Sequence, residues 1–163
     1  MNSDRWRDWL NEHGPGLVLF ARRWAPSQSD AEDLVQEAFV RFWRERERVG
    51  EPVAYLYACV KRCAMDWRRT MERRTRREMG AAGERDECLF EPSGQDSERR
   101  EAVEVALGRL PEEQRDVVVL KIWGGLTFQE VAGILDIPSN TAASRYRYAL
   151  EAMRAWLPEE VQQ

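Results

Sequence analysis

The 163-residue chain has no long uninterrupted run of apolar residues, and this absence limits what the protein can be. No stretch approaches the ~18 apolar residues that a membrane-spanning helix requires, so we expect no membrane insertion. Charged side chains also interrupt the apolar residues of the N-terminus, which is not the pattern of a signal peptide. We therefore expect a cytoplasmic protein.

Groups for catalysis and metal binding are also scarce. The sequence has one histidine and three cysteines, and it lacks a nucleotide-binding glycine loop and a recognisable pair of catalytic carboxylates. Cys59, Cys63 and His13 could be imagined as metal ligands, but structural zinc normally takes four, and Cys63 falls on an apolar helix face. The odd cysteine number argues against a disulfide framework. We expect no enzymatic activity, no metal and no cofactor.

Positive charge is present, but it is concentrated in one segment. The whole chain has a formal net charge of −4, whereas residues 61–77 hold eight Lys and Arg side chains against two acidic ones, a local charge of +6. Local clustering of this kind is typical of a surface that binds phosphates, whatever the net charge of the protein.

The distribution of Gly and Pro divides the chain into two halves. Residues 76–97 contain three glycines and one proline, have no sustained apolar period and are acidic in their second half. This composition predicts a flexible linker. On both sides the apolar spacing is helical, so we predict an all-α protein with small domains at 1–75 and 98–163.

A first amphipathic helix is predicted after Ser29, which forms a capping box with Glu32. Its inner face carries Leu34, Val35, Ala38, Phe39, Phe42 and Trp43. The opposite face is acidic and polar and includes one apolar side chain, Val40. An exposed valine among carboxylates could be a partner contact or an ordinary exposed apolar residue.

A second long helix is predicted to begin at Pro52, where the missing N–H of proline costs nothing. Arginines and an aromatic ring share its outer arc, which consists of Tyr55, Arg62, Met65, Arg69 and Arg73. Such a surface can neutralise phosphates and stack unpaired bases. A solvated charged helix is the alternative, but the segment has few acidic residues to form i,i+4 pairs.

The C-terminal half predicts a helix-turn-helix. Helices are expected from Ser97 to about Arg109 and from Pro111 to Gly124, followed by a short helix that Thr127 and Glu130 cap. Asp136 to Pro138 breaks that helix, and Ser139 is expected to cap the last one. The outer face of the last helix carries hydrogen-bonding and basic groups suited to a major groove, namely Asn140, Thr141, Ser144, Arg147 and Tyr148, with Arg145 at its flank. A helical hairpin without a DNA role is the alternative.

Three blocks, in order, resemble the bacterial RNA polymerase sigma factors of the extracytoplasmic-function type. They are DAEDLVQEAFVRFW (30–43), AYLYACVKRCAMDWRR (54–69) and LPEEQRDVVVLKIWGGLTFQEVAGILDIPSNTAASRYRYALEAMR (110–154). The resemblance implies a non-enzymatic initiation subunit whose partners are core RNA polymerase and promoter DNA. It leaves open whether an anti-sigma protein holds the chain inactive.

The resemblance also implies which residues serve each partner. The DLVQE motif, which in the family docks on the polymerase clamp helices, corresponds to Asp33, Leu34, Val35, Gln36 and Glu37, and the exposed Val40 is assigned to the same surface. The minus-ten element is assigned to Tyr55, Lys61, Arg62, Met65, Asp66, Arg69 and Arg73. The minus-thirty-five element is assigned to Asn140, Thr141, Ser144, Arg145, Arg147 and Tyr148.

The chain departs from the family pattern at Tyr55, Arg62 and Ala143, and Arg147 and Tyr148 also replace other residue types. Family members commonly have Trp at the position of Tyr55, Asn at that of Arg62 and a basic residue at that of Ala143. We therefore expect an unusual promoter preference. A stand-alone regulator that uses only its helix-turn-helix remains the second hypothesis, although it would not need the basic and aromatic helix of the N-terminal half.

Overall fold

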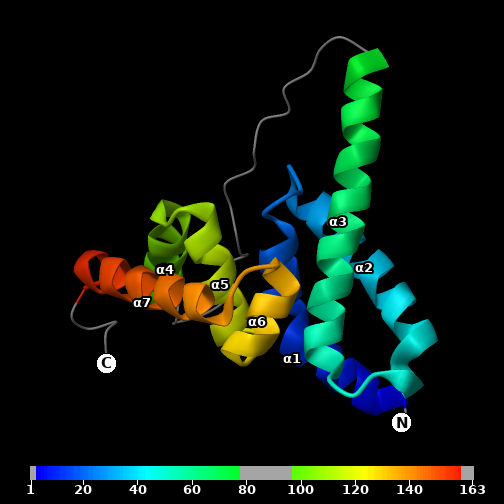
Figure 1. Ribbon diagram of the computed structural model, residues 1–163, viewed down its shortest axis with the longest axis horizontal. Helices are drawn as coiled ribbons and strands as arrows, with labels where there is room; N and C mark the ends of the chain where they lie inside the picture. Colours follow the sequence, from blue (N-terminus) through cyan, green and yellow to red (C-terminus); the bar gives the residue numbers. More distant parts are fainter. Residues whose placement is uncertain (1–2, 78–96, 159–163) are drawn as a thin grey trace.

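The computed structural model describes residues 3–77 and 97–158, and within these ranges all regular structure is helical (Figure 1). The all-α prediction is thus confirmed. The elements are α1 (Ser3–Ala21), α2 (Gln28–Glu45), the short 3-10 helix η1 (Arg46–Arg48), α3 (Pro52–Arg77), α4 (Ser97–Arg109), α5 (Glu112–Ile122), α6 (Phe128–Leu135) and α7 (Ser139–Trp156). The predicted linker lies outside the described residues, except that Arg76 and Arg77 belong to α3 and Ser97 to α4.

The N-terminal half is a bundle of α1, α2 and α3. Helix α2 begins two residues earlier than predicted, because Ser27, not Ser29, is its N-cap and accepts a hydrogen bond from the Asp30 N–H at 3.1 Å. The capping-box prediction for Ser29 and Glu32 was therefore wrong. Edge-to-face contacts of the Trp6 ring with Phe39 and Phe42 join α1 to α2.

Helix α3 begins at Pro52, as predicted, and buries the first part of its inner face. Leu56, Val60, Cys63 and Ala64 are buried, whereas Met71, which helical spacing places on the same face, is exposed. Figure 1 shows why: the C-terminal part of α3 extends beyond the other described helices, so none of them covers it there. Among the described residues, the basic end of the helix is therefore exposed.

The C-terminal half contains the predicted helix-turn-helix. Thr127 and Glu130 form the predicted capping box of α6, and Asp136 ends that helix with a left-handed backbone (φ 54°). The N-cap of α7 is Pro138 and no side chain bonds there, so the prediction that Ser139 caps the helix was wrong. Ala142, Ala149 and Met153 of α7 are buried, and their helical spacing places them on one side of the helix.

The two halves pack against each other. Helix α1 contacts α5, and α3 contacts α6, so that the buried residues form one continuous cluster. This contact brings the basic helix α3 next to the helix-turn-helix (Figure 1). No helix in the described ranges is long and apolar enough to cross a membrane.

Candidate polymerase-binding and DNA-binding surfaces

The predicted polymerase face of α2 is narrower than the motif suggests. Asp33, Gln36 and Glu37 are exposed, and Val40 is 51% exposed. Leu34 and Val35 are 3% and 8% exposed and pack into the core. The prediction that Leu34 and Val35 contact the polymerase therefore needs correction. In the helix these two side chains lie on the side opposite the acidic residues, and their packing in the core fixes the orientation of α2.

An arginine that the sequence analysis did not single out joins this face to α3. Arg41 donates to Glu37 at 2.6 Å and to Asp66 of α3 at 3.1 Å. The hydrogen bond with Asp66 is the main cause that raises the pKa of Arg41, which stays charged. An acid at i and an arginine at i+4 would have indicated the first pair, but only the tertiary packing brings Asp66 to Arg41.

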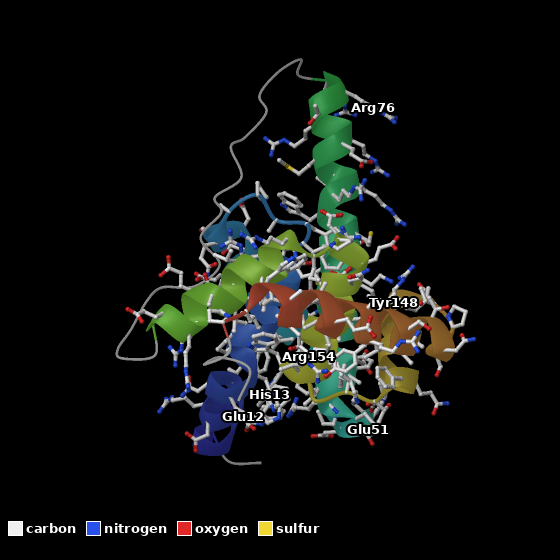
Figure 2. The ribbon with its side chains drawn as sticks, turned by 90° about the vertical axis from the view of Figure 1, so that its left-hand side faces the viewer. Glu12, His13, Glu51, Arg76, Tyr148 and Arg154 are labelled. Carbon is white, nitrogen blue, oxygen red and sulfur yellow. The ribbon has the colours of Figure 1, made fainter. Side chains whose placement is uncertain are left out.

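Most residues predicted for the minus-ten element lie along one arc of α3. Lys61, Arg62, Met65, Asp66 and Arg69 line a cleft between α3 and the helix-turn-helix. Arg73 is exposed further along the helix, in the part that extends from the body, where Figure 2 labels Arg76. This arc of α3 is named the minus-ten face below.

Tyr55 lies at the other end of this face and is half-buried. Its ring packs 6.3 Å from Phe42, and the Arg62 guanidinium lies 6.0 Å from the Tyr55 ring centroid. Among the described residues, no carboxylate lies within ion-pair distance of Arg62, Arg69 or Arg73, because Asp66 pairs with Arg41 and Glu72 with Arg68. The arginines of the face are therefore available to phosphates.

Lys61 differs from the neighbouring arginines of α3 because its side chain already binds α6. Its Nζ donates to the Ile134 carbonyl at 2.7 Å and lies 3.4 Å from the Asp136 carboxylate. Both acceptors lie at the C-terminus of α6, where unpaired carbonyls attract a cation. The structure thus places one predicted DNA contact against the helix-turn-helix itself.

The outer face of α7 presents Arg147 and Tyr148 to solvent. Tyr148 is 52% exposed, and the Arg147 guanidinium lies 5.0 Å from the centroid of its ring. Figure 2 shows Tyr148 and Arg154 on the same helix. Asn140 is exposed, and the Ser144 hydroxyl donates to the Asn140 carbonyl at 2.9 Å. Thr141 is half-buried.

The Arg145 side chain does not project from the outer face of α7. It forms a 3.1 Å ion pair with Glu113 of α5, and its side chain is 27% exposed. Of Arg145 and Arg147, Arg147 is therefore the one that points outward, as its place on the predicted outer face suggests. Arg145 lies at the flank, where it can follow a phosphate strand once Glu113 releases it.

The two thiols of α3 are buried in the apolar interior. Burial raises the pKa of Cys63 to about 11 and also raises that of Cys59, so both remain protonated near neutral pH. A protonated thiol is neither a good nucleophile nor a metal ligand. Among the described residues, no three His, Cys, Asp or Glu side chains are grouped so that they could hold a metal ion.

The comparisons with known proteins cover both halves of the chain. The family model Sigma-70 region 2 matches residues 9–75, and the model Sigma-70, region 4 matches residues 100–153. The first match includes α2 and most of α3, which a stand-alone helix-turn-helix regulator would lack. The regulator hypothesis is therefore excluded.

Curated relatives match over three quarters or more of the chain. The ECF RNA polymerase sigma factor SigL of Mycobacterium tuberculosis is 28% identical and covers 94% of this chain and 89% of its own length. SigK of Mycobacterium ulcerans is 32% identical, covering 76% and 70%, and SigV of Bacillus subtilis is 26% identical, covering 93% and 90%.

Solved structures share the fold. The sigma factor RpoE of Bartonella quintana, in complex with the anti-sigma factor NepR, superimposes with a TM-score of 0.71 at 22% identity and covers 93% of this chain and 96% of its own. CnrH, in complex with the cytosolic domain of CnrY, gives a TM-score of 0.54 at 22% identity, covering 94% and 88%. The chain thus belongs to the extracytoplasmic-function sigma factors, the non-enzymatic subunits that direct promoter-specific transcription initiation by RNA polymerase.

Proposed function

We propose that three exposed surfaces of this sigma factor divide its work. The α2 face of Asp33, Gln36, Glu37 and Val40 docks on core polymerase, the minus-ten face of α3 reads and holds the opened minus-ten strand, and α7 reads the minus-thirty-five duplex. The units that carry them are residues 1–75 and 98–163, joined by the segment 76–97. The site of action is the cytoplasm.

The observation that carries the proposal is the separation of charge between neighbouring helices. The outer face of α2 is acidic and includes an exposed valine, whereas α3 presents arginines that no described carboxylate neutralises. An acidic and apolar face suits a protein partner, and a basic face suits phosphates. Two such faces on adjacent helices allow the chain to bind polymerase and DNA together.

The proposal extends to regulation by a second protein. The sigma factor RpoE, which has the same fold, was crystallised with the anti-sigma factor NepR, and CnrH, also of this fold, was solved in complex with the cytosolic domain of CnrY. We extend this kind of partner to the present chain. Co-purification of a small protein with the tagged chain from its native cells would test this, and a chain that always purifies alone would argue against it.

The α2 face can be tested by placing positive charge on it. Asp33→Lys with Gln36→Lys should weaken the complex with core polymerase while leaving helicity intact, because both side chains are exposed. Glu98→Lys with Glu101→Gln is the matched control, because it makes the same charge change of +3 at exposed side chains of α4. Equal retention of both variants by core polymerase would show that α2 does not dock there.

The two DNA-reading faces can be tested with reconstituted holoenzyme and a promoter library. Arg62→Ala should change base preference within the minus-ten element, whereas Arg73→Ala should lower initiation on all sequences and flatten its salt dependence. In α7, Arg147→Ala should relax preference at one base pair of the minus-thirty-five element, at a cost of ~1–3 kcal/mol.

Arg154→Ala is the matched control for α7, because Arg154 lies two turns beyond Arg147 on the same helix. Arg145→Ala should lower initiation evenly across sequences. If the library yields the same sequence preferences for wild type, Arg62→Ala and Arg147→Ala, neither arginine reads bases and the assignment of the faces fails.

A further inference from the structure

The minus-ten face contains one acidic side chain among its arginines. Asp66 is 55% exposed and lines the cleft together with Arg62, Met65 and Arg69. Arg62 lies four residues before Asp66 and Arg69 lies three residues after it, and side chains at these spacings meet on the surface of a helix. Asp66 is therefore placed to neutralise an arginine of its own helix.

Asp66 pairs instead with Arg41, which projects from α2. One guanidinium nitrogen of Arg41 donates to the Asp66 carboxylate at 3.1 Å, and a second donates to Glu37 at 2.6 Å. Because the guanidinium is planar, its hydrogen bonds have fixed directions, so that Glu37 orients Arg41 and Arg41 orients Asp66. The Asp66 carboxylate is thereby held toward α2.

This pairing leaves the arginines on either side of Asp66 without an acid. Among the described residues, neither Arg62 nor Arg69 has a carboxylate within ion-pair distance. Without Arg41, Asp66 would turn to Arg69, because an acid that precedes its basic partner on a helix is in the more favourable order. Arg62 is the less favourable partner, since it precedes Asp66 and its guanidinium lies 6.0 Å from the Tyr55 ring centroid.

We propose that Arg41 is a positioning residue for promoter binding: it holds Asp66 away from Arg69, so that Arg69 stays free to bind a phosphate of the minus-ten element. The proposal rests on the proposed function of α3. Arg41 acts through Asp66 and needs no contact with DNA. A residue of the helix that we assign to polymerase binding thus determines how much positive charge the minus-ten face can offer.

The first measurement follows Arg69 in the full chain without polymerase or DNA. In NMR spectra of arginine side chains, the Nε–H signal of Arg69 should move in Arg41→Ala, because Asp66 then pairs with Arg69. The signal should return to its wild-type position when Asp66→Ala is added. Arg41 is 40% exposed and its ion pairs lie at the surface, so Arg41→Ala should fold normally. An unmoved Arg69 signal in Arg41→Ala would overturn the proposal.

The second measurement is the affinity of the reconstituted holoenzyme for a promoter that the wild-type holoenzyme selects, over a series of salt concentrations. Arg41→Ala should lower this affinity about tenfold and reduce the salt slope by about one, because the phosphate contact of Arg69 is lost. Arg44→Ala is the matched control, because it removes the same charge from an exposed position of α2 and leaves Asp66 paired. It should have a much smaller effect and keep the salt slope.

A second substitution separates positioning from net charge. Arg41→Ala with Asp66→Ala restores the net charge of wild type and removes the acid that captures Arg69, so the salt slope should return to the wild-type value. Arg41→Ala with Glu51→Ala restores the same net charge next to α3, where Glu51 is exposed, but it leaves Asp66 in place. This variant should keep the reduced slope.

Two results with the holoenzyme would overturn the proposal. Either both second substitutions restore the salt slope equally, which would show an effect of net charge alone, or Asp66→Ala does not restore it. Failure of the proposed function is a separate result: there the Arg69 signal moves in Arg41→Ala as expected, but the holoenzyme with this substitution binds the promoter as tightly as the one with Arg44→Ala.

Discussion

The contact at Tyr57 and the contact at Lys61 join the same two halves but differ in burial. Tyr57 is completely enclosed, and Asp116 of α5, which pairs with Arg23 across the same two halves, is also buried, whereas Lys61 binds at the surface to a carboxylate that is 90% exposed. Burial makes the first contact a determinant of stability, because every lost atom leaves a cavity or an unpaired charge. Water can replace the second contact at little cost. The exposed contact is therefore the one that DNA can displace.

The largest expected effect lies at Tyr57. Tyr57→Ala should lower the free energy of unfolding of the full chain by about 3–5 kcal/mol, the range for removing a buried aromatic side chain. Urea denaturation measures this. Tyr57→Phe is the control: the described residues offer the Tyr57 hydroxyl no hydrogen-bond partner, and burial raises its pKa far above the ordinary value. This variant should be as stable as wild type or more so. Equal losses in both variants would show that the hydroxyl is satisfied.

The next effect is a pH dependence that originates at Asp116. Burial raises the pKa of this carboxyl to about 6 although Arg23 lowers it, so the folded chain binds the proton more tightly than the unfolded chain does. The stability that this proton contributes is complete below pH ~3.8 and is lost as the pH rises through ~6. The free energy of unfolding of wild type minus that of Asp116→Asn should therefore fall by up to about 3 kcal/mol between pH 4 and 7. If this difference in the free energy of unfolding rose between pH 4 and 7 instead, the raised pKa of the buried Asp116 carboxyl would be contradicted.

At pH 7 the two partners of this pair should behave unequally. Arg23→Ala leaves a buried carboxylate alone and should cost about 2–3 kcal/mol, less than a fully trapped charge would, because Asp116 can take up a proton. Asp116→Asn removes the group that is costly to bury and should cost about 1 kcal/mol or less. Thermal or chemical denaturation of both variants shows which substitution lowers stability more. A larger loss for Asp116→Asn than for Arg23→Ala would show that burial is costly for the Arg23 charge and not for the Asp116 carboxylate.

The smallest effect on stability is expected at the exposed contact. Lys61→Met should change the free energy of unfolding by about 1 kcal/mol or less, because water can satisfy the Ile134 carbonyl. The same change should lower affinity of the holoenzyme for all minus-ten sequences alike and reduce the salt slope by about one. A loss of stability as large as that of Tyr57→Ala would remove the distinction between the two contacts.

Local signals were sufficient for much of the fold. The capping box of Thr127 and Glu130, Pro52 at the start of α3 and the break at Asp136 act within a few residues, so the sequence predicts them. Local signals do not predict helix α1, because Gly14, Pro15 and Gly16 are unfavourable inside a helix. Tertiary packing explains the glycine at position 16, because Gly16 leaves room for Tyr57 and Trp123.

In the candidate sites, too, local helical spacing predicts some features and tertiary packing determines others. The exposure of Val40, Arg69, Arg147 and Tyr148 follows from helical spacing and could be predicted. The pairing of Arg23 with Asp116 and the binding of Lys61 to α6 join residues more than seventy positions apart. No pattern within one helix indicates such contacts, because they depend on how the halves pack.

The most direct measurement is site-specific photocrosslinking in the promoter complex of the holoenzyme. A photoreactive residue at Met65 reports on the minus-ten face of α3, and one at Tyr148 reports on the outer face of α7. We predict crosslinks from position 65 to the minus-ten strand and from position 148 to the minus-thirty-five duplex. Both should form in one complex, about 25 base pairs apart. Crosslinks from both positions to the same element, or from either position to protein alone, would contradict it.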